Sequence, residues 1–146
     1  MTREWTRGGY TISTDPSRLD LDVVHGFLVG SYWAEGRTRA RVEQSIEHSL
    51  PFGLYRGKEQ VGFARVVTDY VVLAFLADVF VLEPHRGKGL GAWLVEVVTT
   101  LPDLYPIRRW LLGTRDAHGL YRKFGFEEPT AGVLMEKVDV ESDKRG

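Results

Sequence analysis

The sequence predicts a single α/β domain, in which helices are interposed between four or more strands of a mixed sheet. The chain has 146 residues, which suits one domain with one hydrophobic core. Apolar residues at strand spacing and at helix spacing alternate along it, and no internal repeat or low-complexity segment breaks the pattern. The domain is therefore expected to span residues 1–146, with about 141–146 as a loose polar tail.

Composition excludes several classes of protein. Hydrophobic residues make up 43% of the chain and charged residues 27%, as in an ordinary soluble domain. The 19 basic residues nearly balance the 20 acidic ones, which favours neither a nucleic acid nor a membrane as partner. The absence of cysteine excludes disulfides and thiolate metal sites, and no other metal site is expected. With no signal peptide and no apolar run of membrane length, the protein is expected to be cytoplasmic.

The first half of the chain predicts a strand, two helices and a hairpin. Residues 9–15, GYTISTD, form the strand, and Asp15 with Pro16 then marks a helix start as N-cap and first helical residue. The helix carries on one face Leu19, Val23 and Phe27. Residues 31–37 interrupt it before a second helix from about Thr38 to Ser49. Residues 52–70 alternate as two strands around a tight turn at Arg56, Gly57 and Lys58.

The second half predicts a buried strand followed by helices and shorter strands. The apolar run 71–82, VVLAFLADVFVL, suits a central strand that is buried on both faces. Helical spacing is clearest in Leu90, Trp93, Leu94, Val97, Val98 and Leu101. Residues 107–114 predict another strand, residues 115–125 a helix closed by Gly125, and residues 132–138, GVLMEKV, a last strand.

A glycine-rich turn, HRGKGLG at residues 85–91, lies where the buried strand ends and the clearest helix begins. The first N–H groups of a helix have no internal partner, and the helix dipole adds positive charge, so a phosphate binds well there. Arg86 and Lys88 add full charges. The turn lacks both the P-loop and the GxGxxG dinucleotide pattern. It is either a cradle for a phosphorylated ligand or an ordinary strand–helix turn with solvated cations.

Two motifs resemble those of a known family. The run Arg86-Gly87-Lys88-Gly89-Leu90-Gly91 resembles the acyl-CoA-binding motif, Arg/Gln-x-x-Gly-x-Gly/Ala, of the GNAT (Gcn5-related) N-acetyltransferases. Downstream, DAHGLYRKFGF at residues 116–126 resembles the second signature, a helix with a Tyr shortly before a Gly-Phe pair. The two motifs occur in the family's order, and the resemblance extends over nearly the whole chain.

The resemblance implies a GNAT-like fold, with a mixed sheet of six or seven strands flanked by about four helices. It implies acetyl-CoA as co-substrate and acetyl transfer to a primary amine, by direct attack in a ternary complex. The pantetheine arm would pair with the backbone of Val79, Phe80 and Val81, in a splay beside the central strand. The cradle would hold the pyrophosphate. Asp116 stands where the family often has an Asn that contacts pantetheine; it cannot donate as Asn does, and its other reading is the N-cap of the last helix.

Three residues are candidates for catalysis. The resemblance implies that Tyr121 meets the departing sulfur, although a core aromatic beside Phe124 is the alternative. Asp78 lies in an apolar strand, where a carboxylate with a raised pKa could act as base; a salt bridge or a water-facing edge position is the other reading. His118 shares a helix face with Tyr121 and is a second candidate base, or a solvated surface residue.

The acceptor site is less distinct in the sequence. Tyr32 and Trp33, in the break between the first two helices, and Tyr70, at a strand turn, could shape an amine pocket or be ordinary packing. Small amines and peptide amines both remain open as acceptors. Trp93 and Trp110 could lie in the core or at a homodimer interface. A non-catalytic acyl-CoA sensor and a structural module without any ligand are the competing functions.

Overall fold

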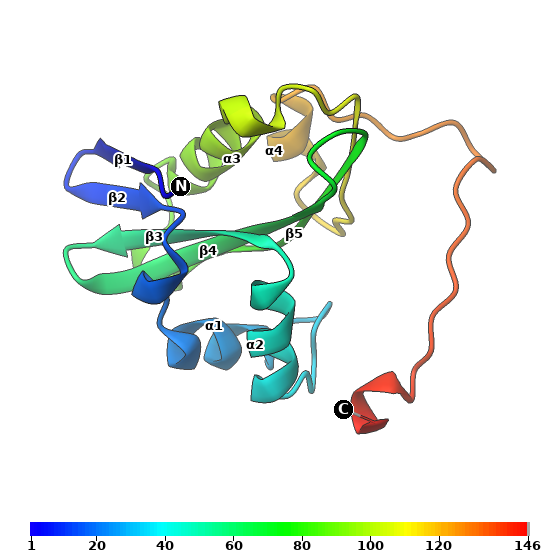
Figure 1. The fold of residues 1–146 in the computed structure, drawn as a ribbon, viewed down its shortest axis with the longest axis horizontal. Helices are drawn as coiled ribbons and strands as arrows, with labels where there is room; N and C mark the ends of the chain where they lie inside the picture. Colours follow the sequence, from blue (N-terminus) through cyan, green and yellow to red (C-terminus); the bar gives the residue numbers. More distant parts are fainter. Residues whose placement is uncertain (146) are drawn as a thin grey trace.

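The computed structural model describes residues 1–145 and shows one six-stranded sheet with helices on both faces (Figure 1). The spatial order of the strands follows the chain, and only the last pair, β5 with β6, is parallel. The strands are β1 Glu4–Arg7, β2 Tyr10–Ser13, β3 Leu50–Arg56, β4 Glu59–Thr68, β5 Leu73–Val81 and β6 Arg109–Leu111. The α-helices are α1 Leu21–Leu28, α2 Arg39–Glu47, α3 Leu90–Thr99 and α4 His118–Arg122. The predicted fold class is confirmed.

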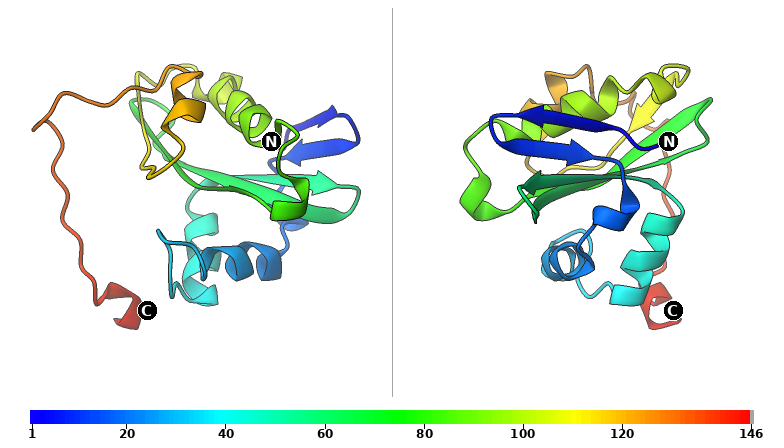
Figure 2. Two further views of the ribbon diagram at one scale, coloured as in Figure 1. Left: turned by 180° about the vertical axis from the view of Figure 1, so that it is seen from behind. Right: turned by 60° about the vertical axis from the view of Figure 1, so that its left-hand side comes forward.

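The two faces of the sheet are covered by different helices (Figures 1 and 2). On one face, α1 and α2 bury Val24, Leu28 and Val42 against Phe63 and Phe80 of the sheet. On the other face, α3 and α4 lie over a larger apolar cluster. The sheet is thus the middle layer of three, and groups on β5 can be reached from either side.

The predicted amphipathic helix after the glycine turn is confirmed as α3. The apolar face is buried as predicted and includes Leu90, Trp93, Leu94, Val97 and Val98. Trp93 is only 6% exposed, so it belongs to the core, whereas Trp110 of β6 is partly buried. Gly89 is the N-cap and has a left-handed backbone, and no side chain caps the helix. The first N–H groups of α3 therefore have no side-chain partner.

The beginning of the chain contains a hairpin that the sequence analysis missed. β1 pairs with β2 across Gly8 and Gly9, whose φ angles are 58° and 82°. Two consecutive glycines between alternating segments are the pattern of a two-residue hairpin turn. The helix predicted to start at Asp15 and Pro16 is only a 3-10 turn, which Asp15 caps. The α-helix α1 begins later and has its own N-cap, Asp20.

The prediction that β5 is a central strand buried on both faces is wrong. Leu73 and Phe75 are 41% and 42% exposed although β6 pairs with β5 over Leu73–Phe75, so the face that carries these two side chains is not fully covered. Beyond that point β5 has a strand partner only on its β4 side among the described residues. The apolar composition of the run concealed this open edge.

The predicted last strand is wrong, since residues 132–138 have no strand assignment and pair with no strand. Met135 is 96% exposed and Val138 69% exposed, in an arm that extends away from the sheet (Figures 1 and 2). The far end of the arm is held elsewhere: it forms a 3-10 turn at Ser142–Arg145, where Arg41 of α2 donates to the Ser142 carbonyl at 2.7 Å. This contact replaces the loose tail expected from residue 141; residue 146 lies outside the described residues.

Substituting Gly62→Ala should destabilise the protein by about 1–3 kcal/mol, the usual cost of overpacking. A Cβ at Gly62 would lie 2.8 Å from the Phe80 carbonyl oxygen and 2.9 Å from Leu54 Cδ2. Gly26→Ala in α1 is the matched control, since its Cβ would meet nothing within 4 Å. That change should be neutral or stabilise by up to about 1 kcal/mol. Urea unfolding measures both, and equal stability of the two variants would contradict the close approach at Gly62.

Candidate functional site

The site begins with an open strand edge on β5. The parallel pairing of β5 with β6 ends at Phe75 and Leu111, although β5 continues to Val81. The two strands therefore diverge, and the β6-facing backbone groups beyond Phe75 have no strand partner among the described residues. The three predicted contact residues Val79, Phe80 and Val81 all lie in this stretch. An extended ligand can form strand-like hydrogen bonds there.

The glycine turn lies at the end of this open edge. Gly87 and Gly89 have φ angles of 79° and 77°, which L side chains rarely adopt. A Cβ built at Gly87, Gly89 or Gly91 would meet no protein atom within 4 Å, so space is open on this side of the turn. Arg86 braces the turn, because its Nε donates to the Val81 carbonyl at 2.8 Å. The free N–H groups of α3 and the open space are the features that the predicted anion cradle requires.

Tyr10 also contacts the turn, through His85 and Lys88, and the sequence analysis did not identify this residue. The Tyr10 hydroxyl lies 2.9 Å from His85 Nδ1, and Lys88 Nζ donates to it at 3.4 Å. Burial opposes ionisation, but neighbouring Arg56 and Lys88 hold the pKa of Tyr10 below its usual value. Tyr10 lies more than 70 residues from the turn in sequence, as the separations of 75 and 78 show, so no local pattern signals this contact. It fixes Lys88 beside the cradle.

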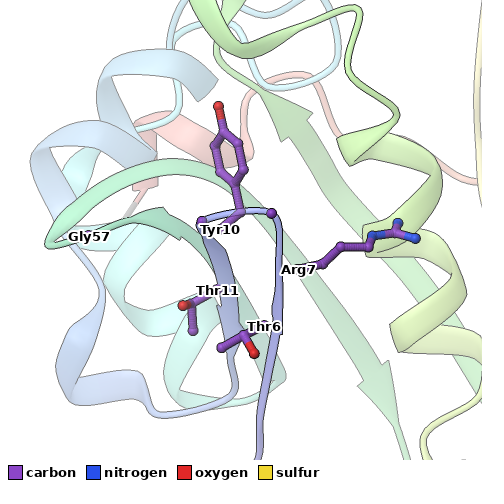
Figure 3. Close-up of a pocket in the computed structure, with 7 residues that line it drawn as sticks. Thr6, Arg7, Tyr10, Thr11 and Gly57 are labelled. Atoms are coloured by element: carbon purple, nitrogen blue, oxygen red, sulfur yellow. The ribbon is translucent and has the colours of Figure 1, made fainter.

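A hollow of about 370 Å³ lies at the β1–β2 hairpin, next to this contact (Figure 3). It is lined by Thr6, Arg7, Gly8, Gly9, Tyr10, Thr11 and Gly57. Figure 3 shows Arg7 pointing away toward the neighbouring helix, where its guanidinium carbon lies 4.9 Å from the Trp93 ring centroid. The hollow is therefore walled by turn backbone and lies outside the opening between β5 and β6.

Asp78 forms the centre of a buried charge cluster. Arg65 Nε donates to its carboxylate at 2.5 Å, Arg37 Nη1 at 3.0 Å and the Trp33 indole N–H at 2.9 Å. The side chain is 2% exposed, and the residue has a φ of 56° at an irregularity in the β4–β5 pairing. Burial by itself would raise the pKa of Asp78, but the two guanidinium groups outweigh it and hold that pKa below its usual value.

The expectation of a raised pKa at Asp78 is therefore wrong, and the salt-bridge reading is the one that the structure shows. A carboxylate that is ionised and bonded to two cations is a poor proton acceptor near neutral pH. Asp78 instead holds together two segments that are distant in sequence, since it joins β5 to the loop between α1 and α2.

Tyr121 lies on α4 and is partly buried against the larger core cluster. Its ring packs edge-on against Phe126, with centroids 5.9 Å apart. Burial raises the pKa of Tyr121, and nearby Tyr32 and Asp116 raise it further. The hydroxyl is therefore protonated at neutral pH and able to donate a hydrogen bond. The same influence shows that Tyr121, Tyr32 and Asp116 lie near one another.

Tyr32 and Trp33 form one wall beside Tyr121. Their rings meet edge-on with centroids 5.1 Å apart, and both side chains remain exposed. The Arg115 backbone N–H donates to the Tyr32 hydroxyl at 3.0 Å, and the Arg115 guanidinium carbon lies 3.8 Å from the Tyr32 ring centroid. This contact joins the loop before α4 to the loop between α1 and α2. Two of the three predicted acceptor residues are thus brought together near Tyr121.

The remaining candidates are placed elsewhere or differently. Tyr70 lines a separate hollow of about 210 Å³ beside the end of α2, whose lining includes neither Tyr32 nor Trp33. His118 is exposed as the first residue of α4 and lies near Glu128. Asp116 is exposed and does not cap α4, because Thr114 Oγ1 accepts from the Ala117 N–H instead. The N-cap reading of Asp116 is therefore wrong.

Residues 1–145 contain neither a cluster of metal-ligating side chains nor a helix of membrane-spanning character. No three His, Asp or Glu side chains in this range lie together in a way that could hold a metal ion. No helix in the same range combines the length and the apolar character needed to cross a membrane.

The structure thus defines an α/β protein with an open strand edge that leads to a glycine turn and an uncapped helix N-terminus. Comparison with known proteins identifies its family. The model of the acetyltransferase (GNAT) domain matches residues 47–128. The chain belongs to the GNAT acetyltransferase family.

Individual relatives agree with this assignment. The protein FG08082 of Gibberella zeae bears the name of an acetyltransferase by inference. It is 32% identical to this chain over 142 residues, and the match covers 83% of this chain and 80% of that protein. A solved structure assigned to the GNAT family, from Xanthomonas campestris pv. campestris, is 43% identical with a TM-score of 0.88, covering 92% of this chain and 96% of that one. A Clostridium acetobutylicum protein solved with acetyl-CoA shares the fold at 10% identity, with a TM-score of 0.64 and coverage of 93% and 96%.

Replacing Asp78→Asn should destabilise the protein by about 3–5 kcal/mol at neutral pH, because two guanidinium groups lose a buried counter-charge. The pKa of Asp78 is lower in the folded protein than the ordinary value of 3.8. Its stabilisation is therefore fully present above that value and is lost as the pH falls through the lowered folded pKa. Urea unfolding from pH 7 to pH 2 should show the wild type losing stability in acid faster than the variant. A stability difference that stays constant across this range would contradict the ion-pair assignment.

Proposed function

We propose that the protein transfers the acetyl group of acetyl-CoA to a primary amine. The observation that carries the proposal is the open β5 edge that ends in the glycine cradle, since together they match an extended thioester ligand with a diphosphate. Membership of an acetyltransferase family supports the same reaction. Tyr121 favours an enzyme over a non-catalytic acyl-CoA sensor, because a neutral hydroxyl near the site has a use in group transfer.

The residues of the site fit coenzyme A. The unpaired edge at Val79–Val81 offers backbone groups to the amide-bearing pantetheine arm. The space in front of Gly87, Gly89 and Gly91 admits the diphosphate to the N–H groups of α3. Arg86 and Lys88 supply counter-charge, with Arg86 tied to Val81 and Lys88 to Tyr10. Acetyl-CoA supplies an activated acyl group as a thioester.

Few groups of this chain need to take part in the acetyl transfer itself. A neutral amine nitrogen attacks the carbonyl carbon of the thioester, and the carbon–sulfur bond breaks as the carbon–nitrogen bond forms. A backbone N–H of β5, at the open edge near Val79, would donate to the carbonyl oxygen as it gains negative charge. Tyr121 would donate its hydroxyl proton or a hydrogen bond to the departing sulfur. The amine proton passes to water, since Asp78 is committed to two arginines.

Acetyl-CoA should raise the melting temperature of the protein, because it binds only the folded state, and pantetheine alone should raise it much less. Gly89→Val should weaken acetyl-CoA binding by at least about 10-fold, because a β-branched side chain resists positive φ and fills the space in front of the cradle. Gly132→Val is the matched control: it also has a positive φ and open surroundings, but it lies in the C-terminal arm.

Differential scanning fluorimetry and calorimetric titration measure these effects, and circular dichroism confirms that each variant is folded. Equal stabilisation by pantetheine and acetyl-CoA, or equal affinity of the two glycine variants, would show that the cradle does not hold the diphosphate. Acetyl transfer is followed in parallel as release of free coenzyme A in the presence of an amine panel.

Tyr121→Phe should lower the turnover number by roughly 10- to 100-fold, the low end for general-acid catalysis because a thiolate already leaves easily. Acetyl-CoA affinity should barely change, since the ring and its packing remain and the loss falls in the transition state. Tyr105→Phe is the control, as Tyr105 is 70% exposed and belongs to no part of the site. Steady-state turnover and calorimetric affinity are measured on the same preparations. Wild-type turnover in Tyr121→Phe would return Tyr121 to a packing role.

A further inference from the structure

The acceptor side of the site carries more positive charge than its internal ion pairs use. Arg37 and Arg65 share the single carboxylate of Asp78, so the cluster has two guanidinium groups and one acid. Arg37 reaches it from the loop between α1 and α2, and Arg65 from β4. Their side chains are 22% and 13% exposed. One positive charge is left over in a partly desolvated place, where it acts strongly on a nearby anion.

Each guanidinium also keeps unused hydrogen-bond donors. Arg37 bonds to Asp78 only through Nη1, and Arg65 only through Nε. The other guanidinium nitrogen atoms of Arg37 and Arg65 make no hydrogen bond within residues 1–145. They are also not buried, because the buried side-chain atoms that lack a hydrogen-bond partner belong to other residues. These nitrogen atoms therefore reach the protein surface. A guanidinium with free N–H groups and a fixed orientation matches the two oxygen atoms of an oxyanion such as a carboxylate.

This surplus charge lies beside the atoms of the proposed reaction. Asp78 directly precedes Val79 on the open edge, and the Trp33 indole binds the same carboxylate. The Trp33 ring meets the Tyr32 ring, and the Tyr32 hydroxyl accepts from the N–H of Arg115 in the segment that leads into α4, the helix of Tyr121. The exposed rings of Tyr32 and Trp33 offer apolar surface between the charge cluster and the helix that carries Tyr121.

Two further acids lie near this wall. Asp116 lies near Tyr121, and Arg115 beside it is stacked on Tyr32 and balances its charge. Glu35 is exposed in the loop between α1 and α2 and forms no ion pair within residues 1–145, so the named charges sum to zero. The preference of the wall therefore comes from the free N–H groups of Arg37 and Arg65 and not from a net charge, and these donors favour an amine that carries an acid.

We infer that the acceptor is a primary amine that also carries a carboxylate, of the amino-acid class, and that this carboxylate binds the free N–H groups of Arg37 and Arg65. The inference rests on the proposed acetyl transfer and specifies its substrate. The carboxylate end binds the arginines, which directs the amine toward the thioester at Val79. The product is an N-acetyl amino acid and free coenzyme A; the nitrogen gains the acetyl carbon and loses one proton to water, and the sulfur gains one proton.

The first experiment compares matched acceptors on the full-length protein with saturating acetyl-CoA. The panel contains the common L-amino acids, β-alanine and 4-aminobutyrate, each beside its amide and its decarboxylated amine. The best carboxylate acceptor should exceed its own amide by at least about 10-fold in kcat/KM, as expected for a hydrogen bond between charged groups. Calorimetric titration into the coenzyme A complex should show the same preference in binding, independently of turnover.

The second experiment assigns the preference to Arg37. Arg37→Gln should raise KM for the carboxylate acceptor about 10-fold more than it raises KM for the matched amide, with little change in kcat for either. Arg37→Lys should restore part of the loss, because it keeps the charge without the planar fork. Arg39→Gln is the control, since Arg39 pairs with Asp22 on the exposed side of α2 and should change neither. Arg65 still neutralises Asp78 in every variant.

The outcomes distinguish a failure of the carboxylate inference from a failure of the proposed acetyl transfer. Amides or decarboxylated amines that react as well as the amino acids, or an equal effect of Arg37→Gln on both acceptors, would overturn the carboxylate inference while acetyl transfer stands. Failure to bind acetyl-CoA, or to acetylate any member of the panel, would overturn the proposed function and the inference with it. A preference for carboxylates that Arg37→Gln abolishes supports both.

Discussion

The interaction on which the rest of the site depends is the one between the Asp78 carboxylate and the two arginines. A non-glycine residue with positive φ carries a cost of order 1 kcal/mol or more, and Asp78 keeps this conformation because its side chain is held from three directions. The irregular pairing at this point bends β5 against β4. It also secures the loop between α1 and α2, which otherwise contacts the sheet through apolar side chains. Both the strand edge and the acceptor wall take their positions from this cluster.

The cradle depends on the same strand at its other end. Where β5 stops at Val81, the chain passes through a 3-10 turn and the glycines before α3 begins at Leu90. The buried face of α3 holds the helix against the sheet, so its N-terminus stays aligned with the open edge. Two positive-φ glycines allow the sharp turn, and the absence of any side-chain cap leaves the helix N–H groups to a ligand. A capping Ser or Asp at residue 89 would satisfy the same donors and compete with an anion.

The sequence predicted the features that local patterns encode, such as α3 from its spacing and the tight turn before it from its glycines. It also placed Tyr32 and Trp33 in a helix break, where the structure puts them beside Tyr121. Long-range contacts could not be predicted in the same way. The two arginines of the charge cluster lie 13 and 41 residues from Asp78, and the sequence showed only a carboxylate in an apolar strand. The prediction of a last strand was wrong for a related reason. An alternating pattern shows that a segment could form a strand, but it does not show whether that segment lies beside another strand with which it can pair.

β5 serves the two halves of the proposed reaction through different parts of one strand. Its unpaired edge, which faces β6, is suited to the acyl donor because backbone groups there need a partner. The side chain of Asp78 binds Arg37 of the loop between α1 and α2 and Arg65 of β4, and these charged groups are suited to the acceptor. The edge and the charge cluster meet where the left-handed backbone of Asp78 passes into Val79. A donor on the edge and an acceptor at the charge cluster would therefore meet near this bend, as the proposed direct transfer requires.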